Sequence, residues 1–228
     1  MRCLPPPSFF AILGDMRMKK EEALRIILKC AEQYENQLAD RNLLILCMDK
    51  AKRVQCMETA FSRNNFLHLT GVKFQKSQVL SANEFYNKCI NKRLSPRAFA
   101  LADNGTTEMK LRILPQLFTK NLSANMAGDF GARTPVLFTE KLAGSVKGGI
   151  GFVLEQNTGY YVPNTVLNED IRKYIMNPQR VIAVYRKEKT AKQYEEITYI
   201  AKKNIHWDEI QYPEQIENLK ELALATAS

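Results

Sequence analysis

The sequence predicts a single α+β domain in which helices fill the N-terminal and middle parts and a small antiparallel β-sheet follows. Apolar residues recur at helical spacing through much of the first half of the chain. From Gly128 onward, short apolar runs alternate with glycines and other turn residues, which is typical of strands. The chain has 228 residues, enough for one sizeable core but short for two full domains.

We expect three regions along the chain. Residues 1–17 contain three prolines and a short apolar stretch, and we expect a disordered leader or a non-native start, with the natural protein beginning near Met16 or Met18. Residues 18–210 are expected to form the α+β domain. Residues 211–228 are expected to form a C-terminal helix and tail.

The first elements follow from local patterns. Residues 18–38 show the spacing of an amphipathic helix. Residues 43–48 and 54–61 are apolar runs on either side of a turn and predict a β-hairpin. Residues 66–74 are expected to form a strand that enters a turn at Gly71.

The middle of the chain is expected to be helical. Ser81 is a suitable N-cap for a helix ending near residue 91, and Glu84 completes a capping box. Pro96 suits the first position of another helical turn. Residues 107–118 and 122–126 are further helical pieces, although Pro115 interrupts the first.

Short β-prone runs follow at residues 135–139, 149–155 and 160–162. Residues 169–175 are expected to form a short helix. Residues 180–186 are apolar at every inner position, which predicts a central strand covered on both faces. Its hairpin partner is expected at residues 194–201, before the C-terminal helix.

Composition argues against several kinds of protein. No apolar run approaches the roughly 18 residues that span a bilayer, so we expect no membrane partner. The five cysteines are scattered and never spaced C-x-x-C, and there are only two histidines, so neither a disulfide framework nor a structural zinc is expected. We therefore expect a cytoplasmic protein that uses no metal and no cofactor.

The net charge of +9 is concentrated near the C-terminal hairpin. Between Arg172 and Lys203 the chain has nine basic residues and three acidic ones. A concentrated positive surface attracts phosphate backbones, which favours RNA as the partner. The alternative is an ordinary solvated lysine surface.

His68 is the first candidate for chemistry. In an extended segment, Thr70 would share its face, beside a turn at Gly71 that lets backbone approach a ligand. Histidine is the natural general acid or base near neutral pH. These features predict a phosphate or nucleotide pocket, with Lys73 as a substrate-binding residue; the alternative is a structural histidine.

A second group of candidates lies between residues 160 and 174. Tyr161, Asn164 and Thr165 offer hydrogen-bond donors beside the end of a strand. Arg172 lies with Asp170 at the start of the expected short helix, where exposed amides favour an anion. The alternative is a helix cap without a ligand.

Two lysines flank the expected C-terminal hairpin. Lys187 ends the central strand and Lys202 ends its partner. With Arg172, these cations could neutralise a phosphate in a transition state. This hypothesis requires Arg172 and Lys187 to converge with His68 on one concave surface.

Several segments in this order resemble a known family. They are FLHLTGVKF (66–74), NEFYNK (83–88), GDF (128–130), GFVLE (151–155), YYVPNTVLNEDIRK (160–173) and RVIAVYRKEK with YEEITYIAKK (180–203). Together they are similar to the fourth class of phage-associated barnase/EndoU/colicin/RelE-like nuclease domains. The resemblance spans roughly residues 40–203, and His-Leu-Thr-Gly and Pro-Asn-Thr are its most specific pieces.

The resemblance implies a barnase/EndoU/RelE-like α+β fold and metal-independent RNA cleavage by attack of the ribose 2′-hydroxyl on the adjacent phosphate. It implies that His68 is the acid or base, that Thr70 and Tyr161 are hydrogen-bonding partners, and that Arg172 and Lys187 stabilise the phosphate. A toxin or phage-conflict effector of this kind would also have an immunity or antitoxin protein as a partner. Two alternatives are an inactive RNA- or protein-binding module on the same fold and an ADP-ribosyltransferase-like nucleotide-binding enzyme.

Overall fold

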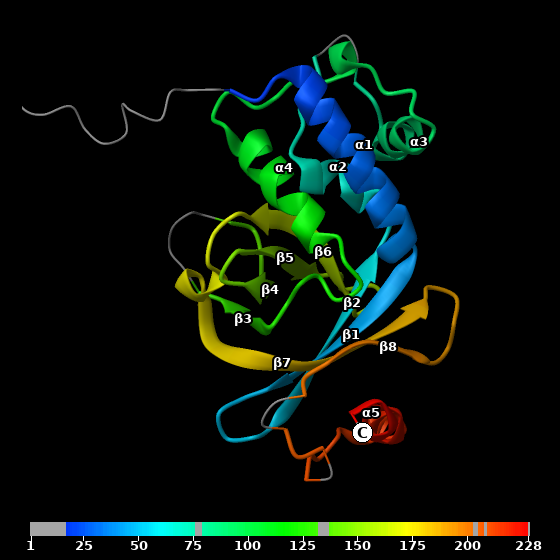
Figure 1. The fold of residues 1–228 in the computed structure, drawn as a ribbon, viewed down its shortest axis with the longest axis vertical. Helices are drawn as coiled ribbons and strands as arrows, with labels where there is room; N and C mark the ends of the chain where they lie inside the picture. The colour runs from blue at the N-terminus through cyan, green and yellow to red at the C-terminus, as the bar shows by residue number, and fades with distance from the viewer. Residues whose placement is uncertain (1–16, 76–78, 132–136, 203–204, 208, 228) are drawn as a thin grey trace, which may run out of the picture.

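Eight strands form one sheet in the computed structural model of the chain, which describes residues 17–75, 79–131, 137–202, 205–207 and 209–227 (Figure 1). The strands are β1 (Arg41–Met48), β2 (Val54–Phe61), β3 (Met126–Phe130), β4 (Lys141–Ser145), β5 (Gly148–Leu154), β6 (Tyr161–Leu167), β7 (Ile175–Glu188) and β8 (Glu196–Ile200). Their order in the sheet is β1-β2-β6-β5-β4-β3-β7-β8, and β1 also pairs with β7. Seven strands therefore close into a barrel, and β8 extends the sheet beyond it.

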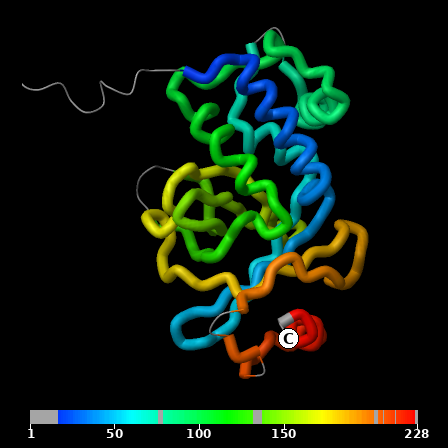
Figure 2. The backbone as a smooth tube through the Cα atoms, in the orientation of Figure 1, coloured from blue at the N-terminus to red at the C-terminus, as the bar shows by residue number. Residues whose placement is uncertain are grey.

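The predicted α+β fold with a small antiparallel sheet is wrong. The barrel is mixed, because β2 and β6 are parallel while the other pairs are antiparallel. The long strand β7 pairs with β3 near its start and with β1 near its end, which closes the ring (Figure 2). The local patterns indicated most of the strands but carried no information on pairing between strands so distant in the sequence.

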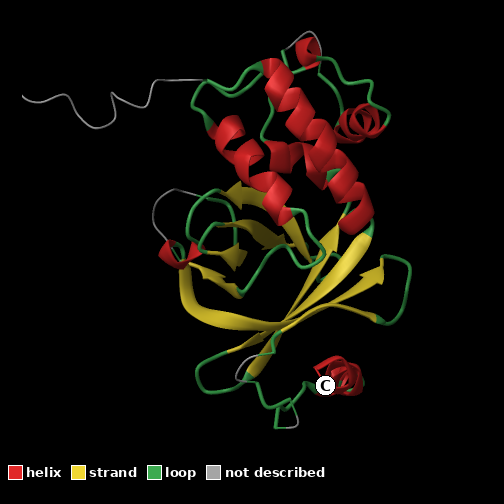
Figure 3. Ribbon diagram, viewed as in Figure 1, coloured by secondary structure: helices red, strands yellow, loops and turns green. Residues whose placement is uncertain are grey.

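The α-helices that precede β3 lie at one end of the barrel, and the C-terminal α-helix lies near the other end (Figure 3). They are α1 (Lys20–Gln37), α2 (Asn65–Thr70), α3 (Ala82–Ile90), α4 (Thr106–Leu117) and α5 (Leu219–Ala227), with short 3-10 turns η2 (Pro96–Ala98), η3 (Ile171–Lys173) and η4 (Glu214–Ile216). Among these helices, α2 and α4 both contact β6. These contacts seat α2 and α4 directly on the barrel strand β6.

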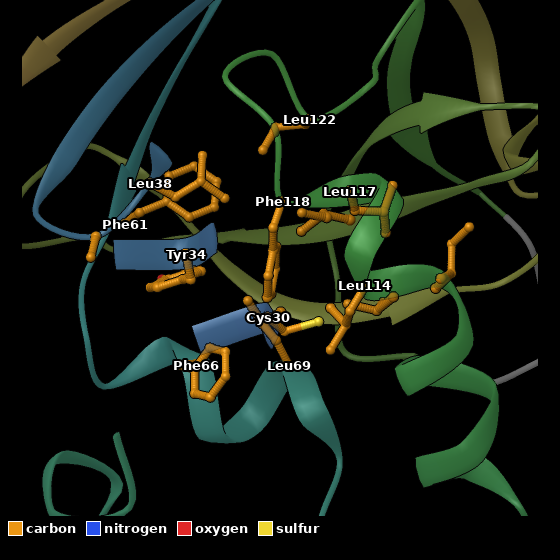
Figure 4. Close-up of a cluster of buried hydrophobic side chains, with 14 of the residues drawn as sticks. Cys30, Tyr34, Leu38, Phe61, Phe66, Leu69, Leu114, Leu117, Phe118 and Leu122 are labelled. Atoms are coloured by element: carbon orange, nitrogen blue, oxygen red, sulfur yellow. The ribbon is translucent and has the colours of Figure 1, made fainter. Parts of the chain in front are cut away.

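The main core joins the barrel interior to the helices. Tyr34 of α1 lies at its centre, with ring centroids 5.0 Å from Phe118, 5.5 Å from Phe66 and 6.2 Å from Phe61 (Figure 4). Side chains from α1, α2 and α4 and from the barrel strands belong to the same buried cluster. Burying such aromatic residues together stabilises the seating of the helices on the barrel.

The central strands are buried on both faces, as expected for residues 180–186. Leu43 and Ile45 of β1 face the main core, whereas Leu44 and Leu46 face a second cluster that includes Trp207 and other residues of the C-terminal segment. Residues of β7 are divided between the same two clusters. This double burial explains why these strands read as continuous apolar runs instead of alternating ones.

Several predicted elements are confirmed with small shifts at their ends. They are the first helix (α1), the hairpin of β1 and β2, the helices α3 and α4, the turn at Pro96, and the strands β5, β7 and β8. The tail contains the expected C-terminal helix, α5. The strand predicted at residues 135–139 lies partly outside the described residues, and residues 137–139 are not in a strand.

Three predicted elements are wrong. Residues 66–74 do not begin as a strand, because α2 (Asn65–Thr70) is a helix that ends at Gly71, whose φ is 68°. The helix predicted at residues 122–126 is a turn followed by β3. The helix predicted at residues 169–175 shrinks to the 3-10 turn η3, in which the Asp170 side chain accepts a hydrogen bond from the amide of Arg172.

The described part of the chain contains no helix with both the length and the apolar composition needed to cross a bilayer.

The capping box of α3 gives a direct test of the fold. The Ser81 hydroxyl accepts a hydrogen bond from the Glu84 amide, and the Glu84 carboxylate accepts one from the Ser81 amide. We expect Ser81→Ala to lower the free energy of unfolding by about 1 kcal/mol, because one amide of the first turn loses its acceptor. For a chain of this size the melting temperature should fall by about 2–4 °C, measured by circular dichroism. Glu84→Gln keeps an oxygen acceptor, so its free energy of unfolding should fall by less than that of Ser81→Ala. An unchanged melting temperature for Ser81→Ala would contradict the role of the cap.

Candidate functional site

His68 is exposed on α2, at the edge of a cleft. The helix forms because the Asn65 side chain accepts hydrogen bonds from the amide and hydroxyl of Ser62, while Phe66 and Leu69 point together into the core. The imidazole of His68 thus lies on the opposite side of the short helix, toward solvent.

The surroundings of His68 favour the neutral imidazole. Partial burial lowers the pKa of His68 below the usual value of about 6.5, and the positive charges of Lys110 and Lys73 lower it further. A hydrogen bond with the backbone of Asn164 opposes these effects. At neutral pH the ring is therefore uncharged and able to accept a proton.

Lys110 of α4 is a second ionisable group at the cleft. Its side chain is 9% exposed, and its Nζ donates a hydrogen bond to the carbonyl oxygen of His68 at 3.3 Å. Burial, and then the charge of Lys73, lower the pKa of Lys110 to about 8. At neutral pH the Lys110 side chain is therefore mostly protonated, and its ammonium group lies next to the backbone carbonyl of His68.

Gly71 leaves the room that the Lys110 side chain occupies. A Cβ atom at Gly71 would lie 2.8 Å from Cδ of Lys110, and the φ of 68° is unfavourable for other residues. The expectation that Gly71 lets backbone approach a ligand stays a prediction. In the structure, the group that lies against Gly71 is the side chain of Lys110.

The cleft has a volume of about 970 Å³ and is lined by α2, the turn after it, residues 100–104 and the first turns of α4. The buried hydroxyl of Thr107 joins two of these walls, because it donates to the carbonyl of Gly71 at 2.6 Å and accepts from the amide of Ala102 at 2.9 Å. Lys73 is held at the cleft by two backbone hydrogen bonds with Ala100. The volume lies in the range of small-ligand sites.

Asn164, whose backbone is hydrogen-bonded with His68, lies at an irregularity of β6. Phe152 of β5 pairs with Pro163, and Gly151 pairs with Thr165, so Asn164 is the extra residue of a β-bulge. Its Nδ2 donates to the carbonyl oxygen of Phe138. Its Oδ1 is buried without a hydrogen-bond partner among the described residues. Bulges of this kind re-aim a strand next to functional sites.

Thr70 and Thr165, both predicted near the substrate, have structural contacts. Thr70 is fully buried, and its hydroxyl donates to the carbonyl of Leu67 at 2.7 Å. The methyl group of Thr165 lies against Gly151, where a Cβ atom would approach it to 2.6 Å. Neither residue lines the cleft beside His68.

Tyr161 lies three residues before Asn164 on β6 and has a different neighbourhood. The ammonium group of Lys141 lies 5.5 Å from the centre of its ring, and Lys141 also forms an ion pair of 2.6 Å with Asp129. Tyr161 is therefore grouped with a polar cluster of β3 and β4, apart from the cleft.

Arg172 and Lys187 lie near opposite ends of β7. A strand rises about 3.3 Å per residue, so the 14 residues of β7 span roughly 45 Å along the chain. Arg172 is paired with Asp170 at 2.5 Å, and the ammonium group of Lys187 lies 4.7 Å from the ring centre of Tyr194. The two cations do not meet at one phosphate, and neither lines the cleft beside His68.

Lys202 is exposed just after β8 and is not among the residues that line the cleft. Of the residues predicted from sequence, the structure thus brings together His68, Lys73 and Asn164. The convergence of His68 with Arg172 and Lys187 is not found.

Lys110 was missed in the sequence, although a signal for it exists. Within the predicted helix at residues 107–118, it shares the spacing of Thr107, Leu111 and Leu114, which are all buried. A lysine on the apolar side of an amphipathic helix must either reach solvent or meet an acceptor. That position marks Lys110 as a residue with a special environment.

No group of three or more His, Cys, Asp or Glu side chains in the described ranges is arranged to hold a metal ion.

One comparison with known proteins gives a match. A family model described as phage-Barnase-EndoU-ColicinE5/D-RelE like nuclease4 matches residues 26–203, which is more than half of the chain and includes the cleft. No curated protein and no solved structure shows significant similarity.

Proposed function

Because the chain belongs to the family described as phage-Barnase-EndoU-ColicinE5/D-RelE like nuclease4, a nuclease family, we propose that it is an endoribonuclease that acts without a metal ion. The observation that carries this proposal is the grouping of one neutral imidazole with two lysines at a single cleft. His68, Lys73 and Lys110 line the same cleft, where they would supply a base and positive charge to a bound phosphate.

The proposed reaction is an internal displacement at phosphorus. His68 takes the proton of the ribose 2′-hydroxyl, and the 2′-oxygen attacks the adjacent phosphorus. The bond from phosphorus to the 5′-oxygen breaks, and that oxygen receives a proton, which Lys110 can supply. The products are a 2′,3′-cyclic phosphate and a free 5′-hydroxyl. Lys73 and Lys110 neutralise the phosphoryl oxygens as their charge increases.

We expect purified protein to cut RNA equally well with and without EDTA, because protein groups alone supply acid, base and charge. Total RNA and a defined oligonucleotide, separated on denaturing gels, give the measurement. Replacing one ribose of the oligonucleotide by deoxyribose should block cleavage at that position only. Cleavage of the deoxy position, or loss of all cleavage in EDTA, would contradict the mechanism; retention of RNA without products would instead favour a binding module.

The pH dependence of kcat/KM should be bell-shaped. Activity needs the neutral form of His68, so it should rise with pH through a value below about 6.5, because the pKa of His68 is lowered. Activity also needs protonated Lys110, so it should fall as pH rises through its pKa of about 8. Rates measured under subsaturating RNA at constant ionic strength test both limbs. A kcat/KM that does not change between the acidic limb and about pH 8 would argue against His68 as the base and Lys110 as the acid.

A further inference from the structure

Phe138 is the most solvent-exposed large apolar side chain among the described residues. It is 90% exposed, and none of the other strongly exposed large apolar side chains among the described residues is aromatic. A ring that stays in water contributes almost nothing to the stability of the core, so its whole apolar surface is available to a binding partner.

The backbone of Phe138 is hydrogen-bonded to Asn164, a neighbour of His68. Its carbonyl oxygen accepts the hydrogen bond from Nδ2 of Asn164, and the backbone of Asn164 is hydrogen-bonded with His68. The residues that follow are anchored to β5, because the Thr139 hydroxyl and the Glu140 amide both donate to the carbonyl of Phe152, at 3.0 and 2.8 Å. Two successive hydrogen bonds therefore connect the exposed ring's own residue to the imidazole.

The charged and the aromatic groups are linked to His68 through different elements of the fold. Lys73 and Lys110 approach it from the cleft. Asn164 belongs to the barrel strand β6, and its side chain donates a hydrogen bond to the carbonyl oxygen of Phe138. A nucleotide has the same two parts, a phosphate that needs cations and a base with two flat apolar faces.

We propose that Phe138 stacks against an unpaired nucleobase next to the phosphate that is cut, so that the substrate is single-stranded RNA. This proposal rests on the proposed function and deepens it. Every base has a face that can stack on an aromatic ring, whereas bases inside an A-form helix are covered by their neighbours. The exposed ring of Phe138 would therefore select for unpaired nucleotides without selecting for one particular base.

Phe138→Ala, Phe138→Trp and the control Val146→Ala test this proposal. Val146 is also exposed and apolar, but it lies in the turn between β4 and β5. Binding is measured by fluorescence anisotropy with a short 2′-O-methyl RNA, which cannot be cut, and with the same sequence as a duplex. Phe138→Ala should weaken single-strand binding by about 5- to 100-fold, raise KM similarly and change kcat little. Phe138→Trp should restore both, Val146→Ala should change neither, and duplex binding should not respond to Phe138→Ala.

The outcomes separate this proposal from the proposed function. Equal single-strand binding by the parent protein and Phe138→Ala would overturn the stacking role even if RNA is cut. Equal weakening of duplex and single strand would also overturn it, because the ring would then serve a surface without strand selectivity. Phe138-dependent binding in a protein that yields no RNA products would support the stacking role and refute the nuclease.

Discussion

Replacing His68 by alanine is expected to lower kcat/KM for RNA cleavage by about 10²- to 10⁴-fold, the usual contribution of a general base. The 2′-hydroxyl is a weak nucleophile, and among the described residues that line the cleft His68 is the only one whose neutral form suits this proton transfer near pH 7. Because the imidazole is exposed, its removal leaves the core unchanged. Single-turnover cleavage of a defined oligonucleotide measures the loss, and the melting temperature shows that the fold is retained.

The matched control is His206→Ala. His206 is also exposed, but it lies in the C-terminal segment, away from the cleft. The His206→Ala variant should cleave RNA at the rate of the parent protein. This result would show that the loss in His68→Ala is specific to position 68. If His68→Ala cleaves as fast as His206→Ala, the base is another group and the proposed site is wrong.

Lys110→Met is expected to lower kcat/KM by about 10²- to 10³-fold, as when one preorganised charge is removed from a transition state. Methionine keeps most of the apolar stem that packs on Gly71, so folding should be preserved, while the ammonium group is lost. The fall in activity near pH 8 should disappear with it, because the group that titrates there is gone. The pH profile of the variant therefore reports a chemical role that a purely structural lysine would not have.

Lys147→Met is the control for this variant. Lys147 is exposed in the turn between β4 and β5, so its replacement removes one positive charge without touching the cleft. The Lys147→Met variant should keep both the acidic and the alkaline limb of the pH profile of kcat/KM. A Lys110→Met enzyme that retains the alkaline fall would show that a different group titrates there.

The sequence predicted local structure better than global structure. The capping box at Ser81 and Glu84 and the hairpin of β1 and β2 depend on near neighbours, and both are confirmed. The barrel depends on β1 pairing with β7 and on β2 pairing with β6, contacts between parts of the chain far apart. A run of alternating or apolar residues shows that a strand exists but does not show its partner.

The same limit explains the site predictions. His68 was found because histidine has a distinctive chemistry, and Lys73 followed from its nearness in sequence. Arg172 and Lys187 were grouped by charge, but the length of β7 separates them. Lys110 comes from another helix, and only the fold shows that it lies behind His68.

The parallel pairing of β2 with β6 has a consequence for how the barrel moves. These strands share one register pair, Thr59 with Tyr161, whereas β1 and β2 are paired along their full lengths. Amide exchange through local opening is therefore expected to be fastest along this seam and slowest in β1 and β7. Because α2 packs on β6, local opening between β2 and β6 is expected to change the orientation of the His68 imidazole.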